Sequence, residues 1–219
     1  AAPKEAAAQA FAYDSFGKTG TVASEKRIAD LGVRTVRFAN NVRLNIKKTD
    51  FEAGKVRFMV RLGDGVLDLP KDQPGLAPMM TLTSAAGGLK KHSLEDLKDL
   101  LAGKVITVGT QVGDNAFLAS GATTPQDLAL QMKVSAAYLL DPGFRPEAAG
   151  KWTQVGPVIE KQVEAQPEAV AGVKLPILLA SGDQRFGMPD AAVLSKRSFD
   201  EAIAALAPVI ASAPIEITV

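Results

Sequence analysis

Three stretches in the first third of the chain alternate apolar and polar residues, which is the period of a strand with one buried face. Two of them lie within residues 34–49 and are separated by Asn40 and Asn41, and asparagine tolerates the positive φ of a tight turn. The third covers residues 55–65, with Val56, Phe58, Val60 and Leu62 on one face and Arg57 and Arg61 on the other. The pattern predicts a hairpin followed by a strand with one face in water.

Between Pro74 and Gly88 the pattern becomes helical, in a segment almost free of charge. Proline suits the first helical positions, and the Gly87-Gly88 pair suits a helix end. We therefore expect a buried helix here. We also expect Leu76 and Leu82 to lie on one side of it, packed against the sheet.

Capping residues mark two more helices. Ser93 with Asp96 three residues later has the pattern of a capping box, and Gly103 suits the left-handed residue that ends such a helix. Ser198 with Glu201 repeats the capping-box pattern near the C-terminus. We expect a helix to begin after each serine.

The segment between these helices predicts a second hairpin and further helices. The hairpin should turn at Gly113-Asp114, and a helix should open with Thr124 as its cap and Pro125 in its first turn. Helices are also expected at residues 151–166 and near residues 174–180.

Prolines and the C-terminal pattern complete the predicted elements. Pro157 and Pro208 should each break or kink a helix, because proline lacks the amide donor and clashes with the preceding turn. The final stretch "PIEITV" has the pattern of a strand, truncated at the C-terminus. Hairpins interspersed with helices predict an α+β fold, a two-layer sandwich whose mainly antiparallel sheet is covered by helices on one face.

Length and composition favour one folded domain. With 219 residues and 47% hydrophobic content the chain can bury a single core. Residues 1–33 are polar, rich in Ala and Lys, and show turn signals with little periodicity, which predicts a linker. Residues 34–219 then form the domain.

Charge and cysteine content exclude several functions. A net charge of +1 provides no long-range attraction for nucleic acid or an anionic membrane surface. The absence of cysteine excludes disulfides, thiolate nucleophiles and thiolate metal sites. No run of about 18 apolar residues is long enough for a membrane span. We therefore expect neither nucleic acid nor a membrane among the partners.

The candidate chemistry is sparse. A zinc-peptidase helix needs two histidines one turn apart and a glutamate between them to activate water, but the chain has one histidine, His92. We expect His92 to be a solvated residue at the start of a helix, because a lone general base would need a partner that the sequence does not show. Residues 63–65 and 87–88 lack the Lys-Ser/Thr of a phosphate loop, so turns are expected there.

Residues 38–88 resemble the opening of a domain of the pitrilysin/insulinase family of zinc metallopeptidases. The family's Asn-Gly-Val/Leu hairpin, the glycine and small residue that end its next strand, and its Gly-Leu-Ala triplet are resembled by Asn40-Asn41-Val42, Gly63-Asp64 and Gly75-Leu76-Ala77. The resemblance extends over about residues 36–219.

In active members the zinc motif His-x-x-Glu-His follows that triplet at once. The resemblance places Pro78 at the first ligand, Thr81 at the general base and Leu82 at the second ligand. Glu160 lies near the third ligand position, but without the two histidines we expect an ordinary surface glutamate. The resemblance thus implies no catalytic residue, no metal ligand and no cofactor in this fragment.

The resemblance implies a metal-free, non-catalytic domain of a two-half bacterial zinc metalloendopeptidase, inactive alone. It would form part of the wall of a peptide-binding chamber, with the catalytic half of the same polypeptide and a peptide substrate as partners and zinc in that other half. Residues 1–33 would be the linker from a preceding half, and a bacterial periplasm suits such a protein. The alternatives are a metal-free scaffolding subunit and a peptide-binding module that uses an exposed strand edge.

Overall fold

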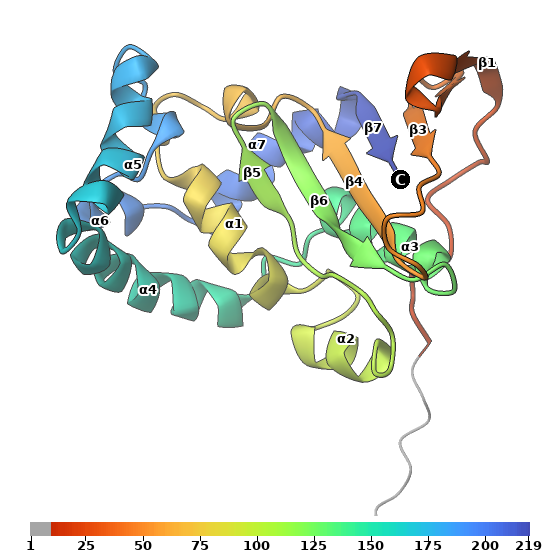
Figure 1. The fold of residues 1–219 in the computed structure, drawn as a ribbon. Coiled ribbons are helices and arrows are strands. Elements are labelled where there is room, and N and C mark those ends of the chain that lie inside the picture. Colours follow the sequence, from red (N-terminus) through yellow and green to blue (C-terminus); the bar gives the residue numbers. More distant parts are fainter. Residues whose placement is uncertain (1–9) are drawn as a thin grey trace, which may run out of the picture.

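The computed structural model describes residues 10–219, except for the side chains at positions 156 and 160. Its sheet has seven strands in the order β1-β2-β3-β7-β4-β6-β5 (Figure 1). All neighbours are antiparallel except β3 and β7, which are parallel. The strands are β1 Val22–Ile28, β2 Val33–Phe38, β3 Arg43–Lys47, β4 Val56–Leu62, β5 Gln111–Gly113, β6 Ala116–Thr123 and β7 Ile215–Thr218.

Helices α3 and α7 lie behind the sheet in Figure 1, α1 packs beside the edge strand β5, and α4 to α6 form one end of the molecule. The helices are α1 Leu76–Gly87, α2 Leu94–Leu100, α3 Leu128–Leu140, α4 Pro146–Glu164, α5 Pro167–Leu179, α6 Ala191–Leu194 and α7 Phe199–Ser212, and the 3₁₀ turns are η1 Ala29–Leu31, η2 Gly65–Asp68 and η3 Gln184–Phe186. The predicted α+β fold is confirmed. Among the described residues, no helix is both long and apolar enough to cross a membrane.

The predicted hairpins are present. The β2–β3 turn contains Asn41 with φ 67°, the left-handed conformation that asparagine tolerates. β5 and β6 pair antiparallel around the expected Gly113-Asp114 turn. On β4, Phe58, Val60 and Leu62 are buried, so the alternation in the sequence correctly identifies the face that packs against the helices.

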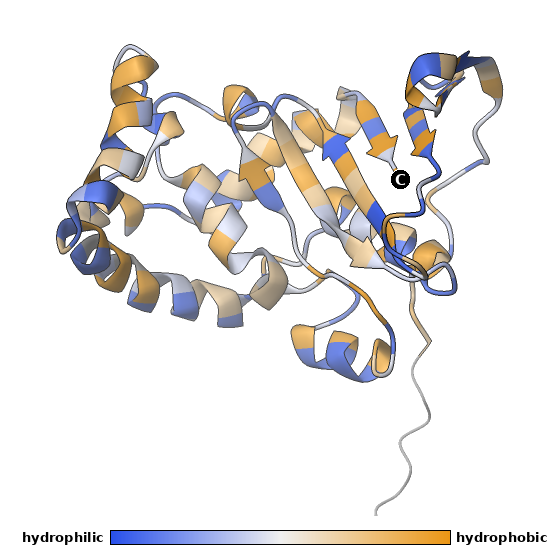
Figure 2. Ribbon diagram, in the orientation of Figure 1, coloured by the Kyte–Doolittle hydropathy of each residue, from blue (hydrophilic) through white to orange (hydrophobic). Residues whose placement is uncertain are grey.

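The main core lies between this face of the sheet and the helices. Figure 2 shows the apolar residues of β4 and β6 in orange, in front of α7. The buried residues of this core include Phe58, Val60, Leu62, Leu76, Met79, Met80, Phe117, Trp152, Leu206 and Val209. Both predicted capping boxes are present, at Ser93–Asp96 and Ser198–Glu201. They fix where α2 and α7 begin.

Three local expectations are wrong. Residues 22–28, within the range expected to be a linker, form strand β1, which pairs with β2 along its length. Thr124 does not cap α3 directly. Its hydroxyl accepts the Asp127 N–H at 3.1 Å in a turn that precedes the helix. Of the break or kink expected at Pro157 and Pro208, the break does not occur, since both helices continue through the proline.

Leu82 is also misplaced by the sequence pattern. Leu76 is fully buried, but Leu82 is 48% exposed. Residues six apart on an α-helix are about 120° apart, since each residue turns the helix by about 100°. The buried face of α1 is formed instead by residues at spacings of three and four: Leu76, Met79, Met80 and Thr83.

His92 is buried, not solvated as expected. Its side chain is 1% exposed and lies under the segment that precedes β1. Its Nε2 accepts the Ala12 N–H at 2.8 Å, and the Phe11 ring stacks on it with centroids 5.5 Å apart. Because this contact joins positions 80 residues apart, no local pattern could reveal it. Burial lowers the pKa of His92 below its usual 6.5.

We expect Leu76→Ala to lower the free energy of unfolding by about 2–5 kcal/mol, because it opens a cavity in the core. Leu82→Ala, on the same helix, should change it by no more than about 0.5 kcal/mol. Denaturant melts of both variants measure the difference. Equal destabilisation would show that Leu82 is buried and that the orientation of α1 described above is wrong.

Acid should loosen the segment around Ala12. Protonated His92 has no acceptor at Nε2, so it cannot receive the Ala12 N–H. The folded pKa of His92 lies below the unfolded 6.5, so its contribution to stability is present above about pH 6.5 and is lost as pH falls through the folded pKa. Hydrogen exchange of the Ala12 amide measured against pH should show this loss. In His92→Gln, which does not titrate, the pH dependence should disappear.

Candidate functional site

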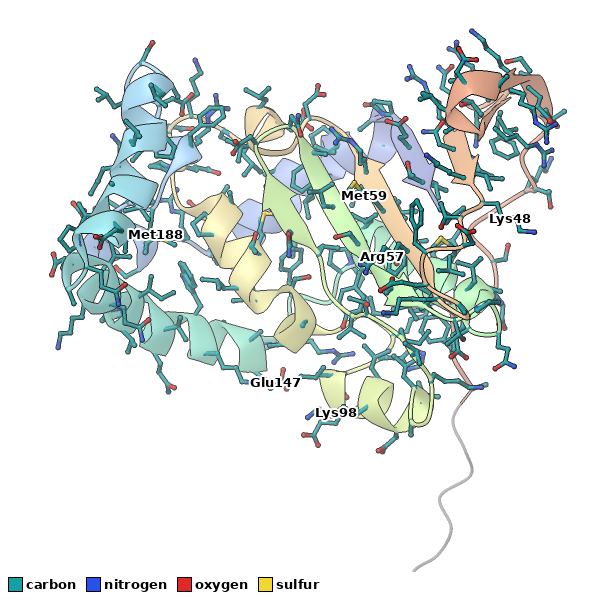
Figure 3. All side chains as sticks on the ribbon, in the orientation of Figure 1. Lys48, Arg57, Met59, Lys98, Glu147 and Met188 are labelled. Atoms are coloured by element: carbon teal, nitrogen blue, oxygen red, sulfur yellow. The ribbon has the colours of Figure 1, made fainter. Side chains whose placement is uncertain are left out.

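An open groove with a cavity volume of about 450 Å³ runs along α1. Pro78, Thr81 and Leu82 form its α1 side, and it is completed by residues of β5, α4, α5 and the segment around η3. Met188, labelled in Figure 3 at the end of the molecule formed by α4, α5 and α6, is one of them. The three residues that the family resemblance assigns to the zinc-motif positions therefore lie together in a groove.

The geometry of α1 explains why these three residues share the groove. Positions spaced by three and four lie on one face of a helix, and this face is opposite to the one that carries Met79 and Met80 into the core. Pro78 is tolerated because it lies in the first helical turn, where its missing amide would have no intrahelical acceptor. The helix starts after Gly75, whose φ is 95°, and a Cβ at that position would approach Leu194 Cδ2 to 2.9 Å.

Hydroxyl groups of α1 bind the edge of the sheet beside the groove. Thr81 Oγ1 accepts the Val112 N–H at 3.0 Å, and Ser84 Oγ accepts the Thr110 N–H at 2.7 Å. Both amides belong to the β5 segment. Thr81, which the resemblance assigns to the general-base position, thus serves as a structural hydrogen-bond acceptor. At these two amides the strand edge is not free to pair with a peptide.

A buried ion pair forms another part of the groove wall. Arg185 is 7% exposed, and its guanidinium binds the Asp183 carboxylate, with an Nη2–Oδ2 distance of 2.7 Å. Its Nη1 also donates to the carbonyls of Val66, Leu67 and Leu69. Through these bonds Arg185 holds η2 against η3. The side-chain hydrogen bond from Arg185 lowers the pKa of Asp183 to about 2.

The groove offers little for metal or proton chemistry. Pro78 and Leu82 have hydrocarbon side chains, and Thr81 has a hydroxyl that is already bonded. His92 is not among the lining residues and belongs to the separate cluster with Phe11. Within the described part of the chain, no three His, Asp or Glu side chains come together in a way that could hold a metal ion.

The expected third-ligand position is only partly described. Helix α4 does run beside α1 and contributes Ile159 to the groove. The side chain of Glu160 lies outside the described residues, so its expected role as a surface residue stays a prediction.

Sequence reasoning missed the Asp183–Arg185 clamp and the two hydroxyl bonds to the β5 segment. Oppositely charged residues two positions apart in a short loop were the only signal for the clamp. Its carbonyl partners are more than 100 residues away in sequence. Nothing local marks Thr81 as the partner of Val112, because 31 residues separate them.

Sequence comparison does not assign this chain to a family, because it matches neither a family model nor a curated protein. Comparison of structures does find relatives. A mutant of the ferredoxin protease FusC in complex with Arabidopsis ferredoxin superposes with a TM-score of 0.74 at 17% sequence identity, over 98% of this chain and 24% of that one.

Two further structures agree. The periplasmic protease PqqL of Escherichia coli superposes with a TM-score of 0.68 at 17% identity, over 99% of this chain and 25% of that one. A peptidase M16 inactive domain from Pseudomonas fluorescens superposes with a TM-score of 0.68 at 14% identity, over 86% of this chain and 46% of that one. The chain spans about a quarter of the length of the two proteases and has the fold of these M16 peptidase structures.

Removing the carboxylate of the buried clamp should destabilise the domain strongly. We expect Asp183→Ala to cost about 3–5 kcal/mol, because the Arg185 charge would remain buried without its counterion. Asp190→Ala is the matched control, since its ion pair with Lys174 is exposed and should contribute no more than about 1 kcal/mol. Urea melts measure both. Similar small effects would mean that the three backbone carbonyls alone hold the guanidinium.

Proposed function

We propose that this chain is a non-catalytic domain of an M16-type zinc metalloendopeptidase, the pitrilysin/insulinase family that the sequence resembles, and that it forms part of the wall of a peptide-binding chamber. One observation carries the proposal. The three residues that the resemblance assigns to the zinc-ligand and general-base positions, Pro78, Thr81 and Leu82, lie together on the groove side of α1.

The physical properties of the groove support a role in contact rather than catalysis. Its lining is largely apolar, with Leu82, Phe186 and Met188 among the side chains, and its buried charge, Arg185, is already paired with Asp183. An extended peptide could lie along such a surface with its apolar side chains in contact and its backbone in water. General acid–base catalysis would need titratable groups that reach the peptide, and the lining residues include one carboxylate without a bound partner, Asp114 at the β5–β6 turn, with no histidine or second carboxylate beside it.

The rest of the proposal concerns the longer protein. Zinc would be held by the partner half of the same polypeptide, residues 1–33 would contain the connection to that half, and the protein would act in a bacterial periplasm. One of the similar structures, PqqL, is described as a periplasmic protease, and another is described as an inactive M16 domain. A His-x-x-Glu-His motif in a preceding half would support the peptidase, and its absence would favour the scaffolding subunit.

Metal and activity measurements on the 219-residue chain test the proposal. After dialysis we expect far less than one zinc per chain, because no lone pairs at positions 78 and 82 can bind an ion. We also expect no cleavage of an unstructured peptide. One tightly bound zinc per chain, together with peptide cleavage that a chelator abolishes, would refute the non-catalytic assignment.

A further inference from the structure

A row of charged residues crosses the face of the sheet opposite to α3 and α7. Arg37 pairs with Arg43 across β2 and β3, Arg43 pairs with Glu216 across β3 and β7, and Glu216 pairs with Arg61 across β7 and β4. Directly opposed residues project from the same face with Cβ atoms about 4.5–5.5 Å apart. Three guanidinium groups therefore come from three strands into one region.

These arginines have no carboxylate partner within the described residues. Arg37 donates to Asn41 Oδ1 at 2.8 Å, and Arg61 donates to the backbone oxygen and Oδ1 of Asn115, each at 3.2 Å. Arg43 makes no hydrogen bond or ion pair within the part of the chain described. By contrast, Arg34, Arg57, Arg185 and Arg197 each form an ion pair with a carboxylate.

Glu216 does not neutralise the row. Its Oε1 accepts the Asn45 Nδ2–H at 2.7 Å, and neither Arg43 nor Arg61 comes within ion-pair distance of it. Two like charges directly opposite each other, as in the Arg37–Arg43 pair, destabilise a sheet. The carboxylates of the described chain therefore offset this repulsion only in part, because neither Glu216 nor Asp64 forms an ion pair with an arginine of the row, and an anion from outside could offset it further.

The row borders a hollow with a cavity volume of about 320 Å³. The three arginines line it together with Asn41 and Asn115, and its other lining residues include Pro214, Ile215, Glu216 and Asp64. The asparagine oxygens orient two of the guanidinium groups without removing their charge. Because Glu216 and Asp64 also line the hollow, its net charge is low, which suits a singly charged carboxylate better than a doubly charged phosphate.

The hollow adjoins the groove along α1. The β5–β6 turn separates them, since Asp114 lines the groove and the next residue, Asn115, lines the hollow. A chain segment that leaves the groove across this turn reaches the arginines. Planar guanidinium forks bind carboxylates through two parallel hydrogen bonds, so acidic side chains on such a segment fit the hollow.

We propose that the hollow formed by Arg37, Arg43 and Arg61 binds carboxylate side chains of an acidic peptide segment. This inference rests on the proposed function in one respect, because it takes the ligand to be a peptide. It adds a preference for acidic sequence to the peptide-contacting surface. Arg57 and Met59, labelled in Figure 3, lie on the same face of β4 further along the strand, and Arg57 is already paired with Glu52.

The test measures peptide binding to the 219-residue chain by fluorescence anisotropy. The probes are an unstructured Gly/Ser peptide with spaced glutamates and its counterpart with glutamines. We expect the glutamate peptide to bind at least about tenfold more tightly, since hydrogen bonds to charged groups are the stronger ones, and its affinity to fall as salt is raised. Arg43→Gln and Arg61→Gln should each weaken binding of the glutamate peptide severalfold.

Arg57→Gln is the matched control and should leave the affinity unchanged. Thermal melts check that each variant is folded. Equal affinity for the two peptides, no binding of either, or full affinity in the Arg43→Gln and Arg61→Gln variants would overturn the inference. Displacement of the peptide by equimolar inorganic phosphate would overturn the peptide part and show a general anion site. None of these results bears on zinc content or cleavage, which decide the proposed function separately.

Discussion

The position of β7 in the middle of the sheet is the constraint on which the other features depend. This short strand, residues 215–218, pairs parallel with β3 and antiparallel with β4. Among the described strands it alone joins the β1-β2-β3 part of the sheet to the β4-β6-β5 part. Successive side chains of β7 point to opposite faces of the sheet. Ile215 and Ile217 pack against the core, whereas Glu216 points into the arginine row. Because these contacts link the last residues to the first strands, the complete sheet forms only after long loops have closed.

The two faces of helix α1 are under different constraints. Leu76, Met79 and Met80 hold the helix in place because their side chains are buried. Replacing any of them with a smaller residue would lower the free energy of unfolding. The opposite face meets only the groove, so Pro78, Thr81 and Leu82 meet no packing requirement of that kind. Thr81 even gains a structural role by holding Val112. The chain has the fold of its structural relatives at 14% to 17% sequence identity, so function has to be argued from the side chains in the groove.

Two surfaces of different character meet at the β5–β6 turn. The groove is largely apolar and its buried charge is paired, whereas the hollow beyond the turn contains guanidinium groups bonded only to neutral oxygens or to none. Apolar contact is tolerant of peptide sequence, and charge is selective. In the function proposed above, the groove would accept many peptides and the hollow would favour those with acidic residues next to it.

The sequence by itself determined the local structure: the β4 alternation, the Asn40-Asn41 turn, the capping boxes at Ser93 and Ser198, and the α+β class. Each depends on residues a few positions apart, where side-chain period and backbone preference act directly. Its resemblance to the pitrilysin/insulinase family also assigned Pro78, Thr81 and Leu82 to the zinc-motif positions. Only the tertiary structure decided that Leu82 faces the groove, that His92 is buried under Phe11, and that Arg37, Arg43 and Arg61 form one row. Those facts depend on strand order and on contacts across tens of residues, because burial and charge pairing are set by neighbours in space.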